Sequence, residues 1–328
     1  MRQLVVTVCL LLFQARVYPQ PYYPQTYYQG GPIWSSDGTQ LVFQIPDGIY
    51  TVRSSGEGLR KVTSGGNPSW ASDGEVVFAD TGGYYSINTD GSQRVLLYAG
   101  GFSISPDGKS VLIEEKDGLR PVFKAIDTDS KVVTTLFYLS DIDRLASFLV
   151  WSPDSKKIAY QVAHGGGMNT PLRLVVQPGT LDIFVSSGPF SWTPDSSHLF
   201  FVRNGNDGSP STYIVTIDSN EEKILVENGF HLALSPDGTR IAFYQNASTY
   251  TYDIYVRDIV GTESVKLVED LDQVCELSWS PDGTMIAFVS YSQDDFSVPQ
   301  LHIVNVNGGK SITAVENLSW GKTKSLFR

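Results

Sequence analysis

The residues that could carry chemistry in this chain are four histidines and a set of aspartates that recur in one kind of turn. A catalytic metal site needs two or three His or carboxylate ligands close together, and a serine hydrolase needs its nucleophile on a sharp Gly-x-Ser-x-Gly turn. No Gly-x-Ser-x-Gly is present. The histidines, which fall at four different places of the repeat described below, are His164, His198, His231 and His302. We therefore predict no catalytic residue, no metal, no cofactor and no enzymatic activity.

The acidic residues are better explained by turns than by ion binding. The acidic segments 127–130, 140–144 and 204–209 lack the twelve-residue ligand spacing of a calcium loop, and Asp, Asn and Gly are the residues that hairpin loops need. One turn aspartate returns along the chain at equivalent positions, and a ring of identical residues cannot form a single active site. We interpret these residues as structural: Asp37, Asp73, Asp107, Asp154, Asp195, Asp237 and Asp282.

One phrase, seen in its fullest form as "LSWSPDGTMIAF" at 277–288, recurs eight times and must position all of these residues. The copies begin near residues 32, 68, 102, 149, 190, 232, 277 and 318, about 41 residues apart on average. All six tryptophans occupy the same place in the phrase, and Ile104 and Leu234 stand there in the other two copies. Pro, Asp and Gly suit successive positions of a tight turn, although Ser155 and Ser196 replace the glycine in two copies.

The phrase predicts an all-β protein. It supplies two strands around a tight turn, and the residues between copies supply a second hairpin, so each repeat is a four-stranded antiparallel meander. Such units bury both faces by stacking in a circle, which makes a β-propeller. Seven repeats are complete, from about 32 to 316. We expect an eighth blade, in which strands at 318–320 and 325–327 are completed by the N-terminal residues; the alternative is seven blades with a packed C-terminal tail.

On these residues the chain resembles the WD40-like repeats of the TolB family, whose signature is a Trp-Ser-Pro-Asp-Gly turn followed by Ile-Ala-Phe. The resemblance covers nearly everything after about residue 30, but the separate N-terminal α/β domain of TolB has no counterpart. It implies a propeller. It also implies three settings for function: partner binding in the envelope Tol–Pal system, partnership with prolyl oligopeptidase-like or tricorn peptidases, and metal-dependent oligogalacturonate lyases.

The composition and the N-terminal residues indicate where the protein is located and which classes of partner are disfavoured. The net charge of −11 and the pI of about 4.8 disfavour nucleic acid and anionic membrane surfaces. Cys9 and Cys275 cannot build a disulfide framework if the leader is removed. The apolar run 4–13 is too short to span a bilayer but fits a secretory signal. We expect a targeting segment at 1–18, a single propeller domain at 19–328, export from the cytoplasm and a monomer, with membrane attachment only through an uncleaved N-terminus.

The loops that fail to repeat are the predicted binding surface. The loops between the second and third strands are short in the first three repeats and long in repeats four to seven, at 161–171, 202–211, 244–252 and 289–299. Aromatic anchors among adaptable polar groups are typical of binding surfaces. We therefore predict a scaffold that docks a protein, peptide or glycan on this side. The candidate residues are Tyr244, Asn246, Tyr250, Tyr252, Tyr291, Asp294, Asp295 and Phe296.

Overall fold

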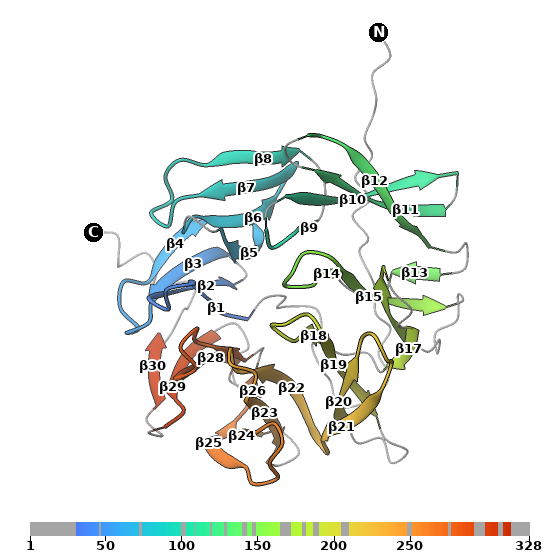
Figure 1. Cartoon of the computed structure of the whole chain (residues 1–328). Coiled ribbons are helices and arrows are strands. Elements are labelled where there is room, and N and C mark those ends of the chain that lie inside the picture. The colour runs from blue at the N-terminus through green and yellow to red at the C-terminus, as the bar shows by residue number, and fades with distance from the viewer. Residues whose placement is uncertain are drawn as a thin grey trace, which may run out of the picture.

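The computed structural model describes residues 31–315, except 46, 72–73, 100–102, 108, 119, 128–129, 140–142, 146–148, 165–171, 179–181, 186–189, 205–209, 248–250, 275–276, 292–298 and 308–310. Within these residues the strands form seven separate antiparallel sheets. The sheets stand around a common centre, with the short first strands inside and the last strands on the outer rim (Figure 1). The predicted all-β propeller is therefore confirmed, and every described blade is built from consecutive residues.

The first three blades have four strands each. Blade 1 contains β1 (Ile33–Trp34), β2 (Gln40–Ile45), β3 (Gly48–Arg53) and β4 (Arg60–Thr63). Blade 2 contains β5 (Gly66–Trp70), β6 (Val76–Asp80), β7 (Gly83–Ile87) and β8 (Val95–Ala99). Blade 3 contains β9 (Ser103–Ile104), β10 (Ser110–Asp117), β11 (Arg120–Asp127) and β12 (Val133–Tyr138).

Blades 4 and 7 differ because two short segments share the place of the innermost strand. Blade 4 contains β13 (Asp143–Leu145), β14 (Val150–Trp151), β15 (Ile158–His164), β16 (Leu172–Gln177) and β17 (Asp182–Val185). Blade 5 contains β18 (Phe190–Trp192), β19 (His198–Asn204), β20 (Pro210–Thr216) and β21 (Glu222–Val226). Blade 6 contains β22 (Gly229–Leu234), β23 (Arg240–Asn246), β24 (Tyr252–Asp258) and β25 (Val265–Leu271). Blade 7 contains β26 (Gln273–Val274), β27 (Ser278–Trp279), β28 (Met285–Tyr291), β29 (Pro299–Asn305) and β30 (Ser311–Val315).

The apolar triplet after each turn builds the core between blades. Successive side chains of a strand point to opposite faces, so the outer two residues of a triplet meet the preceding blade and the middle one meets the following blade. In blade 1, Leu41 and Phe43 pack in a cluster with residues of blade 7, whereas Val42 packs in a cluster with residues of blade 2. All three are fully buried. The repeat therefore codes for packing on both faces.

The ring closes directly between blades 7 and 1. The indole Nε1 of Trp34 in β1 donates a hydrogen bond to the carbonyl oxygen of Ser278 in β27, at 3.1 Å. Leu301 and Ile303 of β29 are buried in one cluster with Phe43 of β2. The expected eighth blade is therefore not shown: blades 7 and 1 already bury their facing sides against each other. The strands expected at 318–320 and 325–327 lie outside the described residues.

The predicted targeting segment at 1–18 also lies outside the described residues and stays a prediction. Among the residues that are described, no helix is long and apolar enough to cross a membrane.

Candidate functional site

The repeated turn is held by its aspartate. In blade 6, Ser235 Oγ donates to Asp237 Oδ1 at 2.5 Å, and the Thr239 backbone N–H donates to the same oxygen at 3.0 Å. These hydrogen bonds lower the pKa of Asp237 to about 2, with the Ser235 hydroxyl as the largest cause. Equivalent Ser or Thr contacts hold Asp37, Asp107, Asp154, Asp195 and Asp282. These six aspartates therefore close turns, as their repetition indicated, and Asp73 lies outside the described residues.

The two serines that replace the turn glycine link neighbouring blades. Ser155 and Ser196 adopt φ values of 61° and 60°, in the left-handed region that favours glycine. Their hydroxyls compensate for this conformation: Ser155 Oγ accepts a hydrogen bond from the Asp107 N–H of blade 3, at 3.1 Å. In the same way Ser196 Oγ accepts from the Asp154 N–H of blade 4, at 3.0 Å. The departure from the repeat is thus an inter-blade contact.

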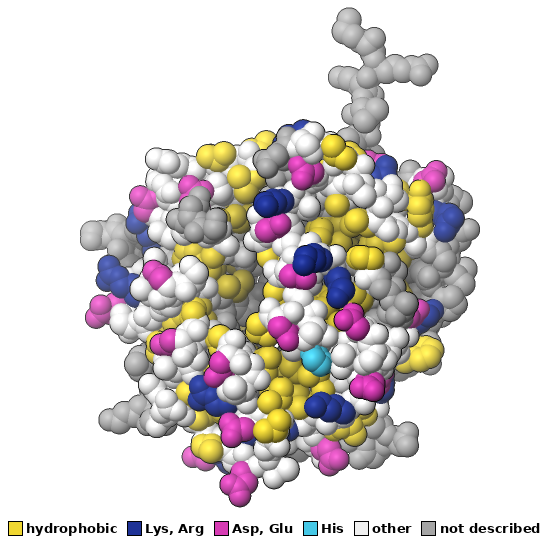
Figure 2. Space-filling view, viewed as in Figure 1, with side chains coloured by type: hydrophobic (Ala, Val, Ile, Leu, Met, Phe, Trp, Pro, Cys, Tyr) yellow, Lys and Arg dark blue, Asp and Glu magenta, His cyan; other side chains and the backbone are white. Residues whose placement is uncertain are grey.

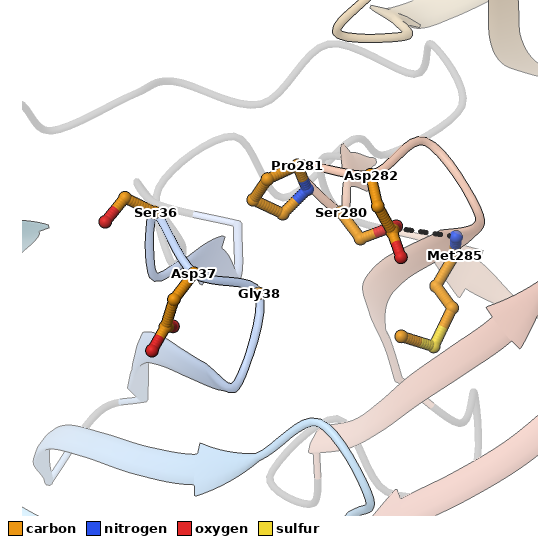
Figure 3. A pocket seen from close by; sticks show the side chains of 7 residues that line it. All are labelled: Ser36, Asp37, Gly38, Ser280, Pro281, Asp282 and Met285. Atoms are coloured by element: carbon orange, nitrogen blue, oxygen red, sulfur yellow. Dashed lines mark hydrogen bonds between the residues drawn. The ribbon is translucent and has the colours of Figure 1, made fainter.

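A shallow cavity of about 320 Å³ lies where the turns of blades 1 and 7 meet. Its lining residues are Ser36, Asp37, Gly38, Ser280, Pro281, Asp282 and Met285. Figure 3 shows the two aspartates coming from opposite turns, while the Met285 backbone N–H donates to Ser280 Oγ at 2.9 Å. Each carboxylate already accepts hydrogen bonds within its own turn. The cavity is a gap between two structural turns.

The repeated tryptophans join blades through their indole N–H groups. Four of them, Trp34, Trp70, Trp192 and Trp279, donate to a backbone carbonyl of the preceding blade at 2.9–3.2 Å. Trp151 in blade 4 is different, because its Nε1 is buried without a hydrogen-bond partner. The sequence located these residues correctly but gave no signal for the hydrogen bonds or for the exception.

The two histidines whose side chains the structure describes, His198 and His302, lie in different blades. His302, in the third strand of blade 7, is buried against Phe288 with a ring distance of 4.7 Å, and its Nε2 lies 2.8 Å from Ser290 Oγ. Burial lowers its pKa to about 4. His198 lies at a turn of blade 5 next to Ser197. The side chains of His164 and His231 are outside the described part. Among the described residues, no three His, Cys, Asp or Glu are grouped so that they could hold a metal.

Stacks of two aromatic rings and a cation are a feature that the sequence reading missed. In blade 2, Phe78 stacks on Tyr85, and the Arg94 guanidinium lies 3.9 Å from the Tyr85 ring centre and 2.8 Å from the Asp80 carboxylate. Cation–π contacts of this kind add to the packing. Similar sets are Phe43, Tyr50 and Lys61; Phe243, Tyr255 and Lys266; and Phe201, Tyr213 and Arg203, in which the cation lies on the second strand of the blade instead of the fourth. An aromatic residue opposite the triplet Phe was the signal available in the sequence.

The predicted difference in loop length is present. In blades 1–3 the connections between the second and third strands are residues 46–47, 81–82 and 118–119. In blades 4–7 they are residues 165–171, 205–209, 247–251 and 292–298. Of the predicted docking residues, Asn246 is exposed and Tyr252 is partly buried at the start of β24. Tyr250, Asp294, Asp295 and Phe296 lie outside the described residues.

Two of the predicted docking residues are core residues instead, which corrects their expected exposure. Tyr244 is only 2% exposed, and its hydroxyl donates to the Val274 carbonyl of blade 7 at 3.3 Å. Tyr291 is 4% exposed and packs in the cluster between blades 7 and 1. Both residues lie on the strand face that packs against the following blade, Tyr244 one alternation beyond Ala242 and Tyr291 two alternations beyond Ala287. The loops predicted at 244–252 and 289–299 began too early, because β23 extends to Asn246 and β28 extends to Tyr291.

Known proteins resemble this chain in part of its sequence and in its fold. No protein family model matches the chain. A stretch of 98 residues, 28% of this chain, is 30% identical to the uncharacterized peptidase YuxL of Bacillus subtilis. The match spans 14% of that protein's length.

Several solved structures share the fold. Oligogalacturonate lyase from Vibrio parahaemolyticus has a TM-score of 0.61 and 15% identity, with 85% of this chain and 89% of that chain covered. A puromycin-hydrolyzing peptidase of Mycobacterium tuberculosis has a TM-score of 0.62 and 15% identity, over 88% of this chain and 53% of that chain. TolB from Acinetobacter baumannii is also similar, with a TM-score of 0.46 and 19% identity over 72% of this chain and 58% of that chain. The propeller fold that the resemblance to TolB implies is confirmed by the seven sheets of this chain.

The expected absence of enzymatic activity is corrected by these relatives. The protein matched by sequence is a peptidase, and the proteins that share the fold include a lyase and a second peptidase. The missing Gly-x-Ser-x-Gly turn was weak evidence, since the matched stretch covers a small part of YuxL. Propellers similar to this one therefore occur in enzymes.

Proposed function

We propose that this propeller serves a peptide-hydrolysing enzyme and receives the polypeptide substrate at the long loops of blades 4–7. The observation that carries the proposal is the sequence match to a peptidase, 30% identity over 98 residues. The fold likeness to the propeller domain of the trilobed protease from Pyrococcus furiosus, with a TM-score of 0.57 over 90% of this chain and 98% of that chain, agrees with it.

The loop distribution supports the site. Binding residues are disproportionately placed on loops held by a rigid scaffold, and the long connections are gathered in four consecutive blades. At the base of one of them, Asn246 faces Tyr252 across the β23–β24 pair. Tyr252 also meets the buried Tyr244 edge to face, at a ring distance of 5.6 Å. Such a supported ring loses little side-chain entropy when it binds a ligand.

The acidic chain suits an extended or cationic peptide better than a polyanion. Its net charge of −11 attracts basic groups and repels phosphate or uronate chains at moderate salt. Export belongs to the same proposal, because the apolar run 4–13 has the length of a signal core.

The test measures peptide binding by the full chain. A mixed library of fluorescein-labelled dodecapeptides should bind in anisotropy titrations, and Asn246→Ala with Tyr252→Ala should weaken binding at least tenfold. The matched control is Val265→Ala, an exposed change on the outer strand of blade 6. Equal binding by the double variant and the wild type would contradict the loop site.

A lyase is the second candidate, because the oligogalacturonate lyase structure in complex with manganese covers 85% of this chain and 89% of its own, with a TM-score of 0.62. The discriminating assay supplies oligogalacturonate with and without Mn²⁺ and follows the ultraviolet absorbance of unsaturated products. Manganese-dependent product formation, together with no peptide binding, would replace the peptide proposal by the lyase.

A further inference from the structure

One position of the repeat is polar in six blades and apolar in the seventh. It is the residue just before the apolar triplet, on the strand face that meets the following blade. The residues there, from blade 1 to blade 7, are Gln40, Glu75, Ser110, Lys157, His198, Arg240 and Met285. Met285 lines the cavity of about 320 Å³ between blades 7 and 1. A cavity of this size is at the small end of ligand-binding pockets.

Blade 6 shows which group fills the same gap between its own turn and the turn of blade 7. Arg240 Nη2 donates a hydrogen bond to the Gly283 carbonyl oxygen at 2.7 Å, and its guanidinium carbon lies 5.0 Å from the centre of the Trp279 ring. Gly283 is buried. A guanidinium therefore fills this gap with one hydrogen bond to the backbone and one cation–π contact.

The turns of blades 7 and 1 meet in the same way as those of blades 6 and 7. Pro236 Cδ lies 3.9 Å from the place that a β-carbon on Gly283 would take, and Pro281 Cδ lies 3.6 Å from the corresponding place on Gly38. The φ values of the two glycines are 67° and 69°. The difference is in burial, since Gly38 is partly exposed whereas Gly283 is buried. The cavity is therefore the gap that an arginine fills one blade earlier.

Met285 leaves the place of the guanidinium open. Its side chain is about as long as the aliphatic part of an arginine, packs against the core between blades 7 and 1, and has no N–H to donate. Figure 3 shows Gly38 on one side of the gap and Met285 with Asp282 on the other. We propose that this cavity binds the arginine side chain of a second polypeptide, whose guanidinium donates to the Gly38 carbonyl oxygen as Arg240 does to Gly283.

Asp282 supplies a negative charge beside the gap. The hydrogen bonds of its turn, from the Ser280 hydroxyl and from the backbone N–H and hydroxyl of Thr284, all go to Oδ1, so none of them uses Oδ2. They lower the pKa of Asp282, with the Ser280 hydroxyl as the largest cause, and the carboxylate is ionised at neutral pH. Asp37 of the facing turn also lines the cavity, and its pKa is lowered chiefly by Ser35. Hydrogen bonds between a guanidinium and a carboxylate are stronger than neutral ones.

Charge alone does not select the ligand. Acidic side chains are spread over the face shown in Figure 2, with lysines and arginines among them, and the net charge of −11 attracts any cation. A guanidinium differs from an ammonium group in its planar set of five donors, which can bond a carbonyl and a carboxylate at the same time. A backbone acceptor beside a carboxylate therefore favours arginine over lysine.

This site lies at the opposite end of the blades from the long loops. In blade 7 the turn at 280–283 comes just before β28, whereas the connection 292–298 follows the last residue of that strand. The inference therefore goes beyond the proposed function and does not rest on it.

NMR of the full chain, labelled with carbon-13 at the methionine methyl groups, tests the proposal. The chain has three methionines, Met1, Met168 and Met285, and Met285→Leu identifies the signal of Met285. The peptide acetyl-Gly-Arg-Gly-amide should shift this signal along a saturable curve, and the same peptide with uncharged citrulline should not. A Met285 signal that stays in place, or that moves equally with the citrulline peptide, would overturn the proposal. Met168, in the connection 165–171 of blade 4, reports on the proposed loop site separately.

Two substitutions at the cavity check the contacts. Met285→Arg supplies a guanidinium from the chain itself, so it should abolish binding of the fluorescein-labelled arginine peptide and raise the unfolding temperature. Asp282→Asn keeps an acceptor for the turn and should weaken binding about tenfold. The matched control for added charge is Val260→Arg, at a 93% exposed position of the hairpin between β24 and β25, which should leave binding unchanged. Thermal unfolding checks that each variant is folded. Wild-type binding by Met285→Arg would overturn the proposal, as would equal losses in Met285→Arg and Val260→Arg.

Discussion

The junction between blades 7 and 1 and the junction between blades 3 and 4 use the same repeated residue in different ways. At the first, Trp34 donates its indole N–H to Ser278 of the neighbouring blade. At the second, the Nε1 of Trp151 is buried without a partner. There Phe137 is stacked between Phe123, of its own blade 3, and Tyr160 of blade 4, with ring distances of 4.8 and 4.5 Å.

The difference shows that the repeat puts the same residue at the same position of each blade, whereas the residues around it decide which contacts it makes. The junction of blades 3 and 4, which lacks the indole hydrogen bond, contains the three-ring stack and the Ser155 contact to Asp107. The junction of blades 7 and 1 has a glycine, Gly38, at the corresponding turn position. The junction of blades 4 and 5 has both a serine contact and an indole hydrogen bond, so the three-ring stack is the feature that accompanies the loss of the indole hydrogen bond.

The largest expected effect comes from removing the middle ring of the stack. Phe137→Ala deletes a buried side chain that joins two blades, so we expect the free energy of unfolding to fall by about 3–5 kcal/mol. Denaturant titration measures it. The control is Phe184→Ala, at a 62% exposed position, with an expected change within about 0.5 kcal/mol. Similar losses for both variants would mean that the stack does not hold the junction.

Acid should weaken the core between blades 6 and 7, which extends the comparison to a third junction. Burial lowers the pKa of His302 from 6.5 to about 4, so between these values the unfolded chain binds a proton that the folded protein does not. Stability should therefore fall as the pH falls from 6.5 to 4, by on the order of 3 kcal/mol.

The pH dependence of the unfolding midpoint in urea checks this expectation. His302→Phe should flatten the curve in that window and leave the acid-dependent loss below pH 4, where the turn aspartates titrate. His198→Gln, at a partly exposed turn position, should keep the wild-type slope. A His302→Phe curve that matches the wild type would contradict the assignment.

Two tryptophan substitutions compare the junctions directly. Trp34→Phe removes a hydrogen bond between blades, whereas Trp151→Phe removes a buried N–H that has no partner. We expect Trp34→Phe to cost about 1–3 kcal/mol more than Trp151→Phe, because only the first change loses a hydrogen bond and the second removes a buried polar group that is already unsatisfied. Equal losses in denaturant titrations would show that the indole hydrogen bond contributes nothing.

The smallest expected effect concerns the serine at the turn of blade 4. Ser155→Ala leaves the Asp107 N–H without its acceptor and keeps the positive φ, so we expect a loss of about 1 kcal/mol. Ser155→Gly loses the same hydrogen bond but relaxes the backbone, and should cost less. Thermal unfolding of the two variants separates these effects, and a costlier glycine would reverse our explanation.

The sequence was sufficient to predict the blades because each repeat contains the local signals that form its turns and strands. Turn residues, alternation and one tryptophan per unit predicted the strands and the short and long loops. The number of blades was harder: the phrase at 318–327 looks like another unit, but closure depends on whether blade 7 fits blade 1. The spacing of the repeats in the sequence does not show whether these two blades pack against each other. The buried Tyr244 and Tyr291 were missed for a related reason, because a strand's length depends on its neighbours.

The Trp34–Ser278 contact joins residues 244 positions apart, whereas each described blade is built from consecutive residues. Blades can therefore form one after another as the chain leaves the ribosome, with contacts that are short in sequence. The inward face of blade 1, including Phe43, must wait until β27 to β29 exist. Until then it is an apolar surface without its partner. The time needed to synthesise the chain is thus also the time during which blade 1 is open to aggregation and to chaperones.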